Sequence, residues 1–275
     1  MLIGIVCTLS LLAAVATCCG SGAFESLRWL WVFPVTAAGS FLGLAALWFL
    51  LMFVMSKLVD MDSQQEKDDP FYRGVLDWTL AALIPLLGVK IRTQGMEKTP
   101  KEGRFLLVCN HLNDTDPVVL IHCFRKSQLA FISKRENDKK FIVGPFQRKL
   151  LCQPINREND REALKTILRC IQLLKDDLVS VGVFPEGYVS LDRLLHPFRP
   201  GVFKIAQKAK VPIVVCTLRN THHIFANAMK LKPTEVELHL LDVIPAEELE
   251  GVTAVQIADR VHKMMADDLG PELVL

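Results

Sequence analysis

Residues 105–117 read Phe105-Leu106-Leu107-Val108-Cys109-Asn110-His111-Leu112-Asn113-Asp114-Thr115-Asp116-Pro117. The first five residues are apolar and predict a buried strand. Asn113-Asp114 favours a turn, and Pro117 disfavours the helical backbone conformation at Asp116. Asp116 is therefore expected to cap a helix that begins at Pro117. This turn would fold the carboxylate of Asp116 back onto the imidazole of His111, which is the arrangement of a general base.

The rest of the chain alternates between strand-like and helix-like runs. The strand-like runs are 104–109, 128–132, 178–184, 211–217 and 234–243, and the helix-like runs are 117–125, 159–176, 200–210 and 253–268. Such alternation predicts an α/β fold, with a largely parallel mixed sheet flanked by helices. The apolar stripe of 159–176 is expected to pack on the core, and it consists of Leu164, Ile167, Leu168, Ile171 and Leu174.

The N-terminus predicts a transmembrane helical hairpin. Residues 1–24 and 29–56 carry no charged side chain, and the connector between them holds only Glu25 and Arg28. A bilayer-spanning helix needs about 20 apolar residues, so the second stretch is long enough and the first is borderline. A cleaved signal peptide over residues 1–20 is the alternative, although it would lack the usual positive start.

Three regions follow from this reading. Residues 1–56 form the hairpin, 57–89 form an acidic linker and an amphipathic membrane-surface helix, and 90–275 form the catalytic domain. Lysines and arginines are frequent after Ser56 and almost absent from the hairpin connector. By the positive-inside rule, we expect a cell-membrane protein with its catalytic domain on the cytoplasmic side.

Charge and cysteine content restrict the possible partners. The 275 residues hold 32 Lys and Arg against 30 Asp and Glu, a net charge of +2, so no global field attracts a nucleic acid. One local group of cations suits anionic headgroups or a phosphorylated ligand, unless it is merely a solvated face; it consists of Arg125, Lys126, Lys134, Arg135, Lys139, Lys140, Arg148 and Lys149. The eight cysteines have no C-x-x-C spacing and predict reduced thiols rather than disulfides or a metal site.

The spacing of His111 and Asp116 is weak evidence by itself. His262 and Asp267 share it, but within a predicted helix, where the two side chains face apart. Cys109 is a possible nucleophile, yet it ends an apolar run and is expected in the core. No G-x-S-x-G, S-x-x-K, H-E-x-x-H or Walker motif occurs, which argues against the common hydrolase, zinc and nucleotide chemistries.

Four groups of residues add context to the pair. In order they are Asn110-His111 with Asp116; Ser133-Lys134-Arg135-Glu136, Gly144-Pro145-Phe146 and Pro154-Ile155-Asn156-Arg157; Phe184-Pro185-Glu186-Gly187; and Val211-Pro212-Ile213-Val214. Together they resemble the signature blocks of the glycerolipid acyltransferases, whose best-known members are the 1-acyl-sn-glycerol-3-phosphate acyltransferases. The resemblance spans about residues 90–220. It departs from the family after Gly187, where Tyr188-Val189-Ser190 replaces Thr-Arg-Ser.

The resemblance implies an activity and its partners. A fatty acyl group would pass from acyl-CoA or an acyl carrier protein to the sn-2 hydroxyl of lysophosphatidic acid at a membrane. No metal or bound cofactor is implied. His111 would be the base and Asp116 its orienting carboxylate. The alternatives are another acceptor, such as glycerol 3-phosphate or another lysolipid, and a non-catalytic membrane lipid-binding protein.

The substrate-binding residues are predicted on two grounds. Arg157 can bind two phosphate oxygens with its planar fork, and Lys134 is a second candidate for the phosphate. The resemblance assigns Glu186 and Gly187 to acceptor binding. The charge missing after Gly187 would come from Arg193 or Arg199. The remaining histidines show no partner pattern and are assigned no role; they are His122, His196, His222, His223 and His239.

Overall fold

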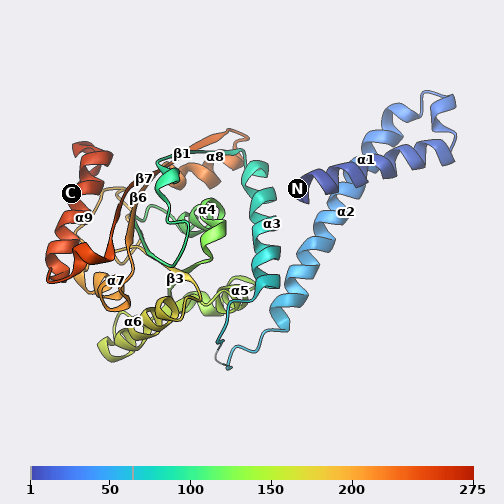
Figure 1. Cartoon of the computed structure of the whole chain (residues 1–275). Coiled ribbons are helices and arrows are strands. Elements are labelled where there is room, and N and C mark those ends of the chain that lie inside the picture. Colours follow the sequence, from blue (N-terminus) through green and yellow to red (C-terminus); the bar gives the residue numbers. More distant parts are fainter. Residues whose placement is uncertain (1, 64) are drawn as a thin grey trace.

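The computed structural model describes residues 2–63 and 65–275, and its centre is one seven-stranded sheet (Figure 1). The strand order is β1-β7-β6-β2-β5-β3-β4, and every neighbouring pair is parallel except β6 and β7. The strands are β1 (Val89–Gln94), β2 (Leu106–Cys109), β3 (Leu129–Lys134), β4 (Gln153–Ile155), β5 (Ser180–Val183), β6 (Ile213–Arg219) and β7 (Thr234–Ile244). The prediction of a largely parallel mixed sheet is confirmed.

Helices cover both faces of this sheet (Figure 1). Their bounds are α1 (Leu2–Gly20), α2 (Trp29–Lys57), α3 (Pro70–Leu86), α4 (Asp116–Cys123), α5 (Val143–Lys149), α6 (Asp160–Lys175), α7 (Lys204–Ala209), α8 (Ile224–Met229) and α9 (Ala254–Leu269). The central strand β2 is buried on both faces. Leu107 belongs to a core with residues of α3 and α4, and Leu106 belongs to a second core with residues of α6, α7 and α9. This burial explains why the strand reads as a continuous apolar run.

The apolar stripe predicted for α6 is only partly in the core. Cys170 and Leu174 are buried, whereas Leu164 and Leu168 are exposed. The buried face is rotated relative to the predicted stripe, because α6 contacts α7 and β4 as well as the central strand β5. Thr166, for example, donates to the carbonyl oxygen of Pro154 at 2.7 Å.

The N-terminal helices α1 and α2 pack together as a hairpin, as predicted (Figure 1). Both are long and apolar enough to cross a membrane, with 19 and 29 residues and mean hydropathies of 2.4 and 2.1, and few of their side chains are buried. The C-terminal part of α2 packs on α3. There the indole of Trp48 stacks on that of Trp78 at 6.4 Å and donates to Thr79 Oγ1 at 3.0 Å.

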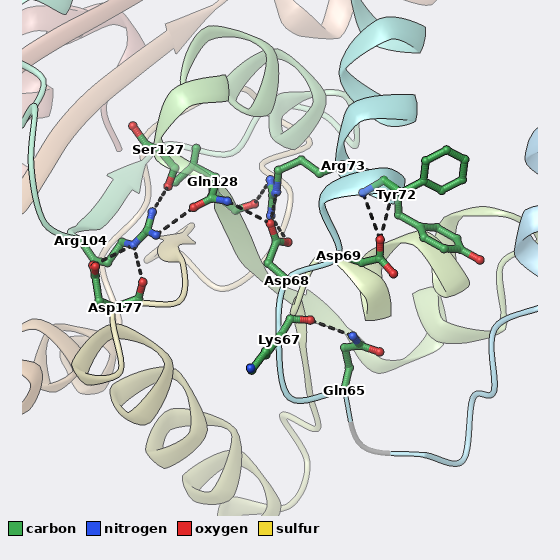
Figure 2. Close-up of polar contacts among 12 residues, drawn as sticks. Gln65, Lys67, Asp68, Asp69, Tyr72, Arg73, Arg104, Ser127, Gln128 and Asp177 are labelled. Atoms are coloured by element: carbon green, nitrogen blue, oxygen red, sulfur yellow. Dashed lines mark hydrogen bonds and ion pairs between the residues drawn. The ribbon is translucent and has the colours of Figure 1, made fainter.

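The acidic linker is tied to the sheet domain by a buried ion pair. The guanidinium of Arg73 in α3 contacts Asp68 at 2.6 and 2.7 Å and also donates to the carbonyl oxygen of Leu129 at the start of β3. Figure 2 shows how this pair continues through Gln128 to Arg104, which donates to Gln128 Oε1 at 2.8 Å. The linker therefore fixes the position of α3 on the sheet.

The basic group predicted to meet anionic headgroups is largely committed to other contacts. Arg148 donates to the carbonyl oxygen of Ser63, and Lys149 lies 3.6 Å from the carboxylate of Asp69. Arg135 pairs with Glu162 on α6 at 2.9 Å. Much of this charge thus holds the linker and neighbouring helices in place.

Candidate active site

Two parallel central strands bring the site together. β2 and β5 are parallel, with Val108 opposite Val183, so the segments that follow them leave the sheet at the same edge. His111 follows the end of β2, and Glu186 follows the end of β5. The carboxyl ends of parallel strands are where α/β sheets usually bind ligands.

The turn after β2 folds Asp116 back onto His111. The Nδ1 atom of His111 lies 2.8 Å from Asp116 Oδ2, and the same oxygen accepts from the backbone N–H groups of Leu112 at 2.6 Å and Asn113 at 2.8 Å. Asp116 is completely buried. A carboxylate can only accept, so Nδ1 carries the proton and Nε2 of the neutral ring is left as a base.

The capping prediction for Asp116 is wrong in detail. Helix α4 already includes Asp116, and the residue at the N-cap position is Thr115, whose side chain makes no capping hydrogen bond. The Asp116 carboxylate turns toward the preceding loop because that loop offers two N–H groups and an imidazole.

Glu186 holds two loops together beneath the site. Its Oε1 accepts from the backbone N–H of His111 at 2.9 Å, and its Oε2 accepts from that of His196 at 3.1 Å. Only 1% of Glu186 is exposed. Burial raises the pKa of this carboxyl, while the two backbone hydrogen bonds and the nearby histidines oppose that shift. Glu186 thus fixes the position of the His111 backbone.

We expect Glu186→Gln to lower the free energy of unfolding by about 1–3 kcal/mol. An amide has one oxygen, so one of the two N–H groups would face an NH₂ group in a buried place. Thermal unfolding in detergent measures the loss. The control is Glu248→Gln, which alters an exposed pair with Arg260 and should change stability by less than about 1 kcal/mol. Equal stability of both variants would show that Glu186 does not hold the loops.

The imidazole is also held by contacts that the sequence analysis missed. The ring of His111 stacks on Phe184 with centroids 3.9 Å apart and planes 12° apart, and its carbonyl oxygen accepts from Ser190 N–H at 2.8 Å. Asn110 fixes the chain just before it, exchanging two hydrogen bonds with the backbone of Leu218 on β6. Phe184 belongs to the third signature block, and Ser190 stands where the family also has a serine, so both could have been proposed from the sequence.

The glycine that follows Glu186 lies under an arginine. Gly187 has φ = +84°, a conformation that favours glycine, and a Cβ built there would stand 2.8 Å from Arg199 Nε. Partial burial lowers the pKa of Arg157, and the charge of Arg199 lowers it further, although both arginines are exposed residues. Neither guanidinium has an ion-pair partner among residues 2–63 and 65–275.

Lys134 ends β3 at the same edge but is engaged elsewhere. Its Nζ lies 3.3 Å from Glu136, and the pair is exposed. Hydrogen bonds lower the pKa of Glu136, and the charges of Lys134 and Arg157 lower it further. Lys134 is therefore connected to Arg157 only through Glu136, which lies near both.

Two of the histidines without a predicted role have carboxylate partners. Nε2 of His196 lies 2.8 Å from Asp192, and Nδ1 of His239 lies 3.0 Å from Asp268. No sequence pattern indicates these contacts, because the first pair forms in an irregular loop and the second joins β7 to α9. Cys109 is buried, and burial raises the pKa of its thiol well above the usual range, so it remains a neutral core residue.

Comparisons with known proteins identify a family and several relatives. The model of the family described as "Acyltransferase" matches residues 90–219. A Chlamydomonas reinhardtii protein described as a 1-acyl-sn-glycerol-3-phosphate acyltransferase is 31% identical over 230 residues, which are 82% of this chain and 66% of that protein. A Mycoplasma pneumoniae protein described as a probable enzyme of the same kind is 29% identical over 69% of this chain and 73% of its own.

A solved structure shares the fold. The crystal structure of the 1-acyl-sn-glycerophosphate acyltransferase from Thermotoga maritima superposes with a TM-score of 0.61 at 21% identity, over 81% of this chain and 88% of that chain. The chain spans about two thirds of the length of the first curated relatives it matches. From its signature blocks and these relatives, the chain belongs to the acyltransferase family.

Proposed function

We propose that this protein transfers a fatty acyl group from an acyl-CoA or acyl-carrier-protein thioester to the sn-2 hydroxyl of 1-acyl-glycerol 3-phosphate, giving phosphatidic acid. The observation that carries the proposal is the 2.8 Å contact between His111 and the buried Asp116 at a sheet edge that also carries the exposed Arg157 and Arg199. The descriptions of the two relatives as 1-acyl-sn-glycerol-3-phosphate acyltransferases support the same acceptor.

In the proposed reaction His111 acts as general base. Its Nε2 takes the proton of the acceptor hydroxyl as the oxygen attacks the thioester carbonyl. Asp116 holds the ring in one tautomer and stabilises the imidazolium. When the tetrahedral intermediate collapses, the C–S bond breaks and His111 returns the proton to the departing thiolate. The ester and the free thiol form without a covalent acyl-enzyme, because a thioester is already activated.

We assign the acceptor phosphate to Arg157 and Arg199. Both arginines are exposed at the sheet edge of His111, with Arg157 after β4 and Arg199 hydrogen-bonded through its backbone N–H to Pro185 after β5. The forked guanidinium group matches phosphate oxygens. Arg199 supplies the charge that this chain lacks after Gly187, because its side chain lies directly beside Gly187, and Arg193 is the alternative. The absence of a side chain at Gly187 leaves room for Arg199. Lys134 would add charge at the rim.

The setting we propose is a membrane, with the sheet domain on the cytoplasmic side. Trp29 and Trp31 begin α2, and Trp48 lies about 26 Å further along it. Tryptophans at such a separation suit the two interfaces of a bilayer core that is about 30 Å thick.

An acceptor panel tests the proposal. Purified full-length protein in detergent should acylate lysophosphatidic acid and should leave monoacylglycerol, which lacks the phosphate, nearly untouched. Acylation of glycerol 3-phosphate alone would overturn the assigned acceptor. No transfer to any member of the panel would favour a lipid-binding protein.

Removing the arginines should affect acceptor binding more than turnover. Arg157→Gln and Arg199→Gln are each expected to raise KM for lysophosphatidic acid by about 10-fold or more, because a hydrogen bond to a charged group contributes about 1.5–3 kcal/mol. KM for the thioester should hardly change. Arg161→Gln is the matched control, since Arg161 is an exposed arginine at the start of α6. An unchanged KM in the first two variants would contradict the phosphate assignment.

A further inference from the structure

A small surface region combines exposed apolar side chains with lysines. Met229 at the end of α8 is 83% exposed, and Leu231 in the following turn is 95% exposed. We call this region the Met229 patch, and it consists of Leu86, Phe225, Met229, Lys230, Leu231 and Lys232, all exposed. Exposure of this kind is unfavourable in water.

The fold holds the patch in a defined place. The turn from α3 into β1 and the turn from α8 into β7 lie side by side, because Thr234 N–H donates to the carbonyl oxygen of Gly88 at 3.0 Å. Leu86 and Leu231 line the same surface hollow between these two turns. The patch is therefore one continuous surface made by two segments far apart in sequence.

The patch lies on the side of the sheet domain that faces the hairpin. Helix α3 runs antiparallel to α2, because Tyr72 contacts Met55 and Thr79 contacts Trp48. Leu86 lies about 12 Å beyond Trp78 along α3, toward the part of α2 that α1 accompanies. Figure 1 shows the end of α3 and the region of α8 on the same side as the first turn of α1.

The patch also lies at the catalytic edge of the sheet. β6 is parallel to β2, and β7 is antiparallel to β6 with Glu237 opposite Arg219. The start of β7 therefore lies at the edge where β2 and β6 end, and β1 starts there too, with Val89 opposite Thr234. His111 and the Met229 patch thus face the same side of the molecule.

We propose that the Met229 patch inserts its apolar side chains into the interfacial layer of a bilayer that contains anionic lipids. Apolar side chains flanked by lysines suit this layer, where apolar groups leave water and ammonium groups remain among the phosphates. Together with the hairpin, this second contact turns the catalytic edge toward the lipid surface. The inference rests on the proposed membrane setting and not on the identity of the acyl acceptor.

Site-directed fluorescence measures the insertion. Leu231→Cys is labelled with an environment-sensitive fluorophore in full-length protein whose Cys7, Cys19 and Cys123 are replaced by Ser. The protein is reconstituted into phosphatidylcholine vesicles with phosphatidylglycerol and a headgroup-region spin-labelled lipid. Leu168→Cys is the matched control, because Leu168 is exposed on α6, away from the hairpin (Figure 1).

We expect the label at position 231 to be quenched at least about threefold more strongly than the label at 168, and to emit at shorter wavelength. Equal, weak quenching at both positions would overturn the proposal and would indicate that a protein or a second copy of the chain covers the patch. The measurement requires no turnover, so it can succeed or fail independently of the proposed activity.

The lysines supply a second test. Lys230→Gln together with Lys232→Gln should reduce quenching at position 231 in vesicles with phosphatidylglycerol and hardly alter it in pure phosphatidylcholine. Each lysine near an anionic surface is expected to strengthen association about fivefold. The same decrease in both kinds of vesicle would contradict an electrostatic contribution.

Discussion

Replacement of His111 by glutamine is expected to lower kcat by about 10²–10⁴-fold while the protein stays folded. Glutamine keeps hydrogen-bonding capacity toward Asp116 but has no nitrogen that takes a proton near neutral pH. The acceptor hydroxyl would then attack the thioester without a base, and the thiolate would leave without an acid. KM for the thioester should change little, because His111 acts on the reacting hydroxyl.

The measurement is thiol release from acyl-CoA with lysophosphatidic acid, at substrate concentrations well above KM. His239→Gln is the matched control, since His239 also contacts a carboxylate, Asp268, but on β7. It should retain activity within about twofold, as expected for a residue away from the chemistry. If His111→Gln turned over at the wild-type rate, the proposed mechanism would be wrong.

Asp116→Asn is expected to reduce kcat by about 10²–10⁴-fold as well. The comparable substitution in a serine-protease triad lowers kcat by about 10⁴-fold, because the imidazole adopts the wrong tautomer. Here Asp116 Oδ2 also receives two backbone N–H groups, from Leu112 and Asn113. An amide oxygen in the place of Oδ2 can keep these bonds and the contact with the ring, but the NH₂ group then takes the place of Oδ1, which is buried without a hydrogen-bond partner in the described part of the chain. The negative charge that stabilises the imidazolium disappears in any case.

Two readouts separate this role from a purely structural one. Asp116→Asn should also unfold at lower temperature, because a buried network has been disturbed. Its kcat should nevertheless remain low at temperatures where the variant is fully folded. The control is Asp114→Asn two residues earlier, whose carboxylate is exposed and lies 3.9 Å from Lys140. A folded Asp116→Asn variant with the activity of this control would rule out the orienting role.

The sequence predicted the fold class because its core strands are continuous apolar runs separated by helical segments. It missed β1 and β4. β1 is a mostly exposed strand that carries Lys90 and Arg92, and β4 has only three residues, with Pro154 at its centre. β1 has only a short apolar alternation, Val89 and Ile91, and β4 has none. Each is an edge strand that is held by its pairing with a neighbour, β7 or β3.

The sequence by itself determined the pairing of His111 with Asp116, because a turn between residues close in sequence needs only local propensities. Only the tertiary structure decided that Glu186 supports His111, that Arg199 lies beside Gly187 and that the end of α3 meets the turn after α8. These contacts join residues brought together by strand register and loop closure. Their stability comes from burying β2 on both faces, which no single segment of the chain encodes.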